Sequence, residues 1–165
     1  MERRLHGSGG QPRALFTELI RNLASKARPE GGALSSVLER WISDLSHEAN
    51  GEDAALEKLI AERLRPLQEL VSGFDIHAVL VQYLRAFRAG DEGRQQSAIR
   101  WLRAEYGTKT EAKADLGVRS IIDDADVYDY LKLYAKFARI MGYQGLVVCV
   151  DELVVLSHRL PSARA

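Results

Sequence analysis

Apolar residues recur at steps of three and four through most of this 165-residue chain, from about residue 11 to residue 142. That spacing places them on one face of an α-helix, so we expect a predominantly helical protein. Glycine, proline and asparagine interrupt the pattern repeatedly and divide it into about six or seven helices. The clearest expected helix carries the apolar residues Leu34, Val37, Leu38, Trp41, Ile42 and Leu45.

The sequence signals for the ends of these helices differ in strength. The first helix is expected to run from Gln11 to about Lys26. Pro66 lies inside the third helical pattern and predicts a kink or a break near Arg65, because proline lacks the N–H that the helix needs. The acidic stretch 123–126 suits a helix N-terminus, where the helix dipole favours negative charge.

Composition excludes several classes of protein. The 23 basic residues equal the 23 acidic ones, so the whole chain lacks the basic excess that nucleic-acid binding usually needs, although a local basic patch is compatible with this balance. A single cysteine, Cys149, and the lack of a signal peptide indicate a cytoplasmic protein. No apolar run is long enough for a membrane span. The four histidines are far apart, which argues against a zinc site.

One segment near the C-terminus breaks the helical pattern. Residues 146–150 read Leu-Val-Val-Cys-Val, and such a run of apolar, mostly β-branched residues predicts a strand buried on both faces, as in a parallel sheet. We therefore divide the chain into a loop (1–10), a helical region (11–142), and a strand with the start of the next element (143–160). The expected fold is mostly α-helical with this one C-terminal strand.

Two carboxylates follow the predicted strand directly, at Asp151 and Glu152. Four or more apolar residues followed by Asp-Glu is the Walker B pattern of P-loop ATPases. A buried strand would hold both side chains at its C-terminal end, where open α/β sheets bind ligands. In that reading Asp151 holds Mg²⁺ at the phosphates and Glu152 is the catalytic base for the attacking water. Any parallel strand that leads into a charged helix start gives the same pattern, so both interpretations stay open here.

Three longer segments carry a family resemblance: Arg3 to Ala24, Leu102 to Arg119 and Ile121 to Leu153. They resemble a bacterial P-loop ATPase family of largely unknown function, which includes the ATP-binding component of phage-exclusion (BREX) defence clusters. The resemblance implies an ATPase related to AAA+ and STAND proteins, with ATP and Mg²⁺ as cofactors of the complete protein. It also implies that this chain is an internal fragment of an α/β domain, ending just after Walker B.

The family's Walker A loop has no counterpart in these residues. No Gly-Lys dipeptide occurs in the sequence. The segment Gly7 to Gly10 lacks the lysine, and no apolar strand precedes it. Gly107 to Thr110 (Gly-Thr-Lys-Thr) imitates the end of a Walker A loop but follows a helix, and it lacks the earlier glycine at the required spacing.

These observations set expectations for the chain and for its partners. We expect it to bind no ATP by itself and to be inactive alone, while the complete ATPase would act with other defence-complex proteins or with DNA. Residues 146–150 would have unpaired strand edges, so we expect self-association through them or their conversion to helix. The alternative from another class is a helical protein-interaction module, in which Asp151 and Glu152 are solvated charges.

Thr108 to Ser120 also resembles the first helix and turn of a helix-turn-helix, with Gly117 at the turn. A DNA-reading helix should follow the turn with polar and basic residues. The sequence instead continues Ile-Ile-Asp-Asp-Ala-Asp at 121–126, which favours a structural turn. For the aromatic residues nearby, the helical spacing favours core packing over base stacking, and these residues are Tyr128, Tyr130, Tyr134 and Phe137.

Overall fold

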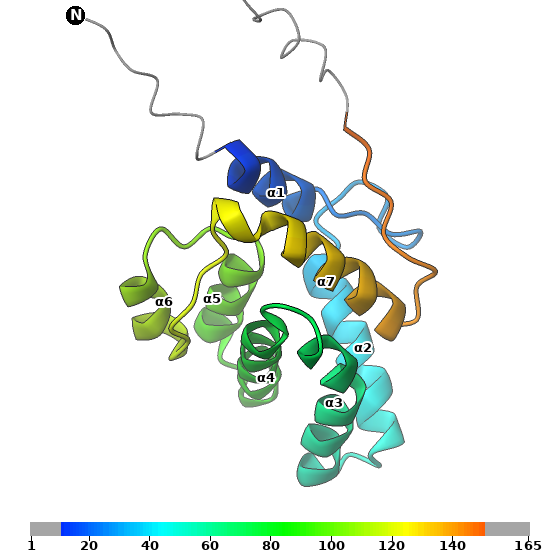
Figure 1. The fold of residues 1–165 in the computed structure, drawn as a ribbon. Coiled ribbons are helices and arrows are strands. Elements are labelled where there is room, and N and C mark those ends of the chain that lie inside the picture. The colour runs from blue at the N-terminus through cyan, green and yellow to red at the C-terminus, as the bar shows by residue number, and fades with distance from the viewer. Residues whose placement is uncertain (1–10, 151–165) are drawn as a thin grey trace, which may run out of the picture.

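A computed structural model describes residues 11–150 (Figure 1). This part of the chain contains seven α-helices and one short 3₁₀-helix. The elements are α1 (Gln11–Arg21), α2 (Leu34–Glu48), α3 (Asp53–Gln68), α4 (Gly73–Ala89), α5 (Glu92–Leu102), α6 (Lys109–Leu116), η1 (Asp124–Asp126) and α7 (Val127–Ile140). The expectation of a mostly helical fold is confirmed.

The last helix of the described residues, α7, joins the others into one core. Three aromatic pairs connect it to helices that are far apart in sequence, and the rings lie close enough for favourable edge-to-face or tilted contacts. The pairs are Phe16 of α1 with Tyr134 (centroids 5.4 Å apart), Trp41 of α2 with Phe137 (5.5 Å), and Trp101 of α5 with Tyr130 (5.8 Å). Figure 1 shows α7, coloured yellow to orange, crossing the molecule below α1.

Both ends of α1 form hydrogen bonds with groups outside the helix. At the start, the backbone N–H of Arg13 donates to a carboxylate oxygen of Asp124 over 2.9 Å, which satisfies one of the first-turn N–H groups that have no partner inside the helix. At the end, α1 stops at Arg21 and not near Lys26, so the predicted end was wrong. The carbonyls of Arg21 and Leu23 accept hydrogen bonds from the N–H groups of residues 32 and 33, which turn the chain into α2.

Helices α2, α3 and α4 follow each other along the chain, and each packs on the next. All six apolar residues predicted for the second helix are buried in α2. Pro66 does not break α3, which continues to Gln68. The proline lies in the last turn, where its missing N–H removes only one hydrogen bond, and its carbonyl accepts from Nζ of Lys136 over 2.8 Å.

An ionic and aromatic cluster fixes α6 against α5. Nη2 of Arg100 lies 2.6 Å from Oε1 of Glu111, and its guanidinium stacks 4.3 Å above the ring centroid of Tyr106. The hydroxyl of Tyr106 donates to Asp115 over 2.8 Å. The hydrogen bond to Glu111 raises the pKa of Arg100, and the charged guanidinium links the two helices through these contacts.

The predicted C-terminal strand is not formed. Residues 146–150 have no regular secondary structure, and within residues 11–150 the structure contains no strand, only an isolated bridge between Ser25 and Arg28. The physical reason is that a buried parallel strand needs a hydrogen-bonded neighbour on each side. The described chain offers no such neighbour, and five apolar residues alone cannot supply one. The conversion to helix, our alternative, does not occur either.

Candidate functional site

The predicted Walker B residues, Asp151 and Glu152, lie outside the described residues. The structure does describe the segment that leads to them. After α7 the chain turns at Gly142, and residues 145–149 then run along one side of α1. Val147 is 85% exposed and Val148 is 44% exposed, so this segment lies on the surface instead of inside a sheet.

A groove of about 520 Å³ separates this segment from the helices. Its helical wall is the outer face of α1 with Leu131 of α7, and its other wall is the extended chain at 145–149. Leu15 and Leu19 of α1 lie on this wall, and Leu23, two residues past the end of the helix, continues their spacing of four. Leu15 is 46% exposed, whereas Leu19 and Leu23 are partly buried, so the described chain covers this row of leucines only in part.

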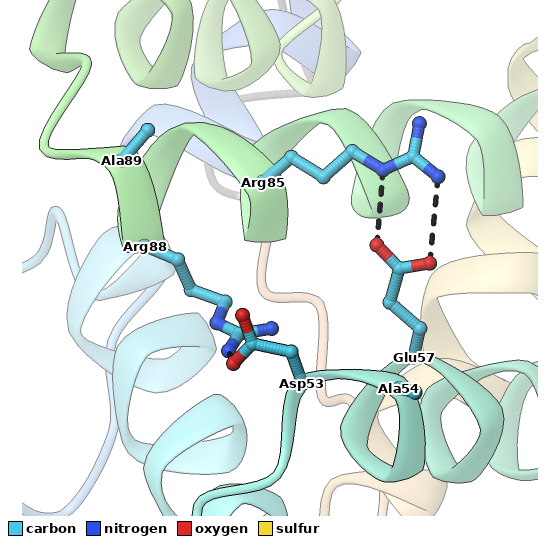
Figure 2. Close-up of a pocket in the computed structure, with 6 residues that line it drawn as sticks. All are labelled: Asp53, Ala54, Glu57, Arg85, Arg88 and Ala89. Carbon is cyan, nitrogen blue, oxygen red and sulfur yellow. Dashed lines mark hydrogen bonds and ion pairs between the residues drawn. The ribbon is translucent and has the colours of Figure 1, made fainter.

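A second cleft, of about 510 Å³, opens between α3 and α4 (Figure 2). Figure 2 shows two arginines of α4 facing two carboxylates of α3 across it. Nε of Arg85 donates to Oε1 of Glu57 over 3.1 Å, and its Nη2 donates to the other oxygen over 3.4 Å. Arg88 forms an ion pair with Asp53. Sequence reasoning missed this cleft, because pairs between residues 28 or 35 positions apart leave no local signal.

The charges of this cleft are balanced, which decides its chemistry. The guanidinium of Arg85 is charged at physiological pH, and its hydrogen bond with Glu57 raises its pKa further. A phosphate group would have to displace a carboxylate from each arginine and would meet both carboxylates as like charges. The cleft therefore links α3 to α4 and lacks the free cations that a nucleotide site would need.

The segment 107–110, whose sequence is similar to the end of a Walker A loop, has a local structural role. Thr108 is the N-cap of α6, and its hydroxyl accepts from the backbone N–H of Glu111 over 3.2 Å. This bond satisfies one of the free N–H groups at the helix start. The segment is thus a helix cap.

The region that resembles a helix-turn-helix contains α6 and the predicted turn. Gly117 ends α6 with a φ of +74°, a left-handed conformation that glycine adopts without strain. No helix follows directly: residues 118–123 are irregular, and the chain next forms the acidic η1. Of the four aromatic residues beyond, Tyr130, Tyr134 and Phe137 are buried, as expected for core packing, whereas Tyr128 is exposed.

One titratable group is held in an unfavourable environment. His77 of α4 is partly buried, and within the described chain its Nε2 is buried without a hydrogen-bond partner. Burial lowers the pKa of His77 below its ordinary value of 6.5, because desolvation penalises the charged imidazolium.

This shift predicts a specific loss of stability in acid. The unfolded chain binds a proton at His77 near pH 6.5 while the folded chain resists it, so the contribution of His77 is complete above that pH and is lost as the pH falls below it. The variant His77→Gln is expected to lose less stability than the wild type between about pH 7 and pH 5. Urea unfolding at both pH values measures this. His47→Gln, at an exposed position of α2, is the control, and equal losses in all three proteins would contradict the prediction.

The described residues contain neither a metal-binding cluster nor a membrane-spanning helix. Within residues 11–150, no group of three or more histidine, cysteine, aspartate or glutamate side chains is arranged to hold a metal ion. None of the helices in this part of the chain is both long and apolar enough to cross a membrane.

Comparison with known proteins supplies what the geometry alone does not. Neither the curated proteins nor the solved structures gave a match to the chain. The profile of one protein family, described as BREX system ATP-binding protein BrxC/D, matches residues 1–165, the whole of the sequence. The resemblance seen in the sequence is thereby confirmed, and the chain belongs to the BrxC/D family of BREX ATP-binding proteins.

Proposed function

We propose that this chain supplies the Walker B element of an ATP-hydrolysing P-loop protein in a BREX system. The observation that carries the proposal is the run 146–150 followed by Asp151 and Glu152, in a chain that matches an ATP-binding family over its whole length. In this proposal the strand forms when neighbouring strands are supplied from outside residues 1–165. The phosphate-binding loop also comes from outside them, since these residues contain no GxxxxGK[ST] motif.

The donor set fits magnesium. Carboxylate oxygens are hard ligands, and Mg²⁺ is usually held by one or two carboxylates together with phosphate oxygens and water. Asp151 would hold the ion, which would supply positive charge against the phosphates of the nucleotide. Glu152 would orient the attacking water and accept its proton.

A second function has one observation in its favour. The described residues form a helical bundle without a strand, as expected for a protein-interaction module with no nucleotide chemistry. In that case Asp151 and Glu152 would be solvated charges and their replacement would leave ATP binding unchanged.

Nucleotide binding separates the two functions. The 165-residue chain alone is expected to show no micromolar affinity for Mg-ATP by calorimetry, because the backbone N–H groups and the lysine of a Walker A loop provide most of the binding. In an ATPase that joins this sequence to its phosphate-binding loop, Asp151→Asn is expected to weaken the Mg²⁺-dependent part of ATP binding.

The control is Asp44→Asn, which replaces an exposed carboxylate on α2 and should change nothing. Micromolar binding of Mg-ATP to the chain alone would refute the dependence on an external loop. Unchanged magnesium dependence in Asp151→Asn would refute the Walker B assignment and favour the interaction module.

A further inference from the structure

The side chains of the segment 146–150 already alternate in exposure as they would in a strand. Leu146 is partly buried and packs against the core, whereas Val147 is 85% exposed. Val148 and Val150 are less exposed than Val147, at 44% and 40%. Because successive side chains of an extended chain point to opposite sides, the even-numbered residues share the face toward the helices, which we call the inner face.

Two helices present apolar side chains on the side of this inner face. The groove beside the segment is lined by Leu19 of α1 and by Leu131 of α7, and Glu18 is the one charged side chain among its lining residues. Leu131 packs against the core, and Leu19 is partly buried. In α/β proteins, helices cover the faces of a parallel sheet with apolar side chains of this kind.

The connection from α7 to the segment is short. The helix ends at Ile140, Gly142 has a positive φ of 94°, and the segment begins at Leu146. A connection of about two to six residues is usual between a helix and the strand that follows it in an α/β unit. Leu146 also lines a second hollow together with Ala135 and Ile140, so the start of the segment lies against α7.

We infer that α1 and α7 form the helical layer over the inner face of the Walker B strand, and that Leu19 and Leu131 are positioning residues for Asp151 and Glu152. This inference rests on the proposed function, in which 146–150 becomes a strand of a sheet. Neighbouring strands pair within the plane of the sheet, and the helices pack on its face, so the two kinds of contact do not compete. Leucines that fix the strand also fix the two carboxylates at its end, and a displacement of about 1 Å at reacting groups is enough to slow a reaction strongly.

The packing of the segment on α7 is tested first, without nucleotide. In urea unfolding of the 165-residue chain, the double variant of Leu131→Ala and Leu146→Ala is expected to lower the midpoint by less than the two single shifts added together, because each single variant already removes the shared contact. Val147→Ala replaces Leu146→Ala in the matched control, and its shift should add to that of Leu131→Ala, since Val147 is on the outer face. Additive shifts for Leu131 and Leu146 would overturn the inference.

The positioning role is tested second, in the ATPase that joins this sequence to its phosphate-binding loop. Leu19→Ala is expected to lower kcat by about 10- to 100-fold. The dissociation constant of Mg-ATP should change by a smaller factor, because the phosphate-binding loop provides most of the binding. Leu19→Met, which keeps the volume of the side chain, should restore most of the rate.

The matched control is Leu59→Ala, which truncates a partly buried leucine of α3 that packs on the core and does not line the groove. It should destabilise the protein and leave kcat unchanged. A wild-type kcat in Leu19→Ala, together with slow hydrolysis in Glu152→Gln, would overturn this inference and leave the Walker B assignment standing. Full hydrolysis in Glu152→Gln would instead overturn the assignment of the catalytic base, and with it the positioning role.

Discussion

Replacing Glu152 by glutamine is expected to slow ATP hydrolysis by about 10²–10⁴-fold, the range that a positioned general base contributes. The amide keeps the size and shape of the side chain and cannot accept the proton of the attacking water. In the proposed assignment Asp151 would still hold Mg²⁺ in this variant, so the dissociation constant of Mg-ATP should change little. The measurement is steady-state phosphate release by the ATPase that joins this sequence to its phosphate-binding loop, together with calorimetric binding of Mg-ATP.

The separation of rate from binding makes this result specific. A general structural defect would lower both quantities together, and Glu62→Gln, at an exposed position of α3, should lower neither. Wild-type hydrolysis in Glu152→Gln would mean that Glu152 is not the base. The Asp151→Asn variant acts on a different step, because it should reduce magnesium-dependent binding before any chemistry takes place.

The second large effect is expected at Gly73, where α3 meets α4. A Cβ added there would lie 1.8 Å from the carbonyl oxygen of Leu67 and 2.9 Å from the Cα of Gln68. These are backbone atoms, so the clash cannot be relieved by rotating a side chain. Gly73→Ala must move one helix relative to the other, and we expect it to lower the free energy of unfolding by about 3 kcal/mol, at the upper end of typical overpacking costs.

Urea unfolding measures this effect as a lower midpoint. The control is Gly107→Ala, because a Cβ at Gly107 meets no atom within 4 Å and its φ is not in the positive range. The control should stay within about 0.5 kcal/mol of the wild type, as surface substitutions usually do. If Gly73→Ala unfolds at the same urea concentration as Gly107→Ala, the close approach of the two helices is not rigid.

The spacing of apolar residues correctly predicted the features that depend on local sequence, such as the buried face of a helix. In α2 every apolar residue of the predicted stripe is buried, because a helix with one apolar face needs only something to pack against. The end of α1 was placed too late because Leu23 continues the apolar stripe. The helix ends earlier because the backbone N–H groups of Gly32 and Ala33, in the loop that follows α1, donate hydrogen bonds to the carbonyls of Arg21 and Leu23.

Features that depend on distant partners could not be predicted. The valine-rich run predicted a strand, but a strand exists only where a second chain segment pairs with it, and the described residues provide none. The ion pairs of Arg85 and Arg88 likewise depend on how α3 and α4 are oriented. The candidate site was predicted from an apolar run followed directly by Asp151 and Glu152. Both residues lie outside the described structure, so their assignment stays a prediction.

The position of α7 in the chain has a consequence for synthesis on the ribosome. Phe16, Trp41 and Trp101 all have their aromatic partners on α7, and Asp124, which precedes α7, accepts a hydrogen bond from the start of α1, 111 residues away. A nascent chain that ends before residue 127 therefore has three helices with uncovered aromatic surface. Such surfaces favour aggregation or chaperone capture during elongation. The N-terminal half can acquire helix early, but it can bury its largest side chains only after nearly the whole bundle has been made.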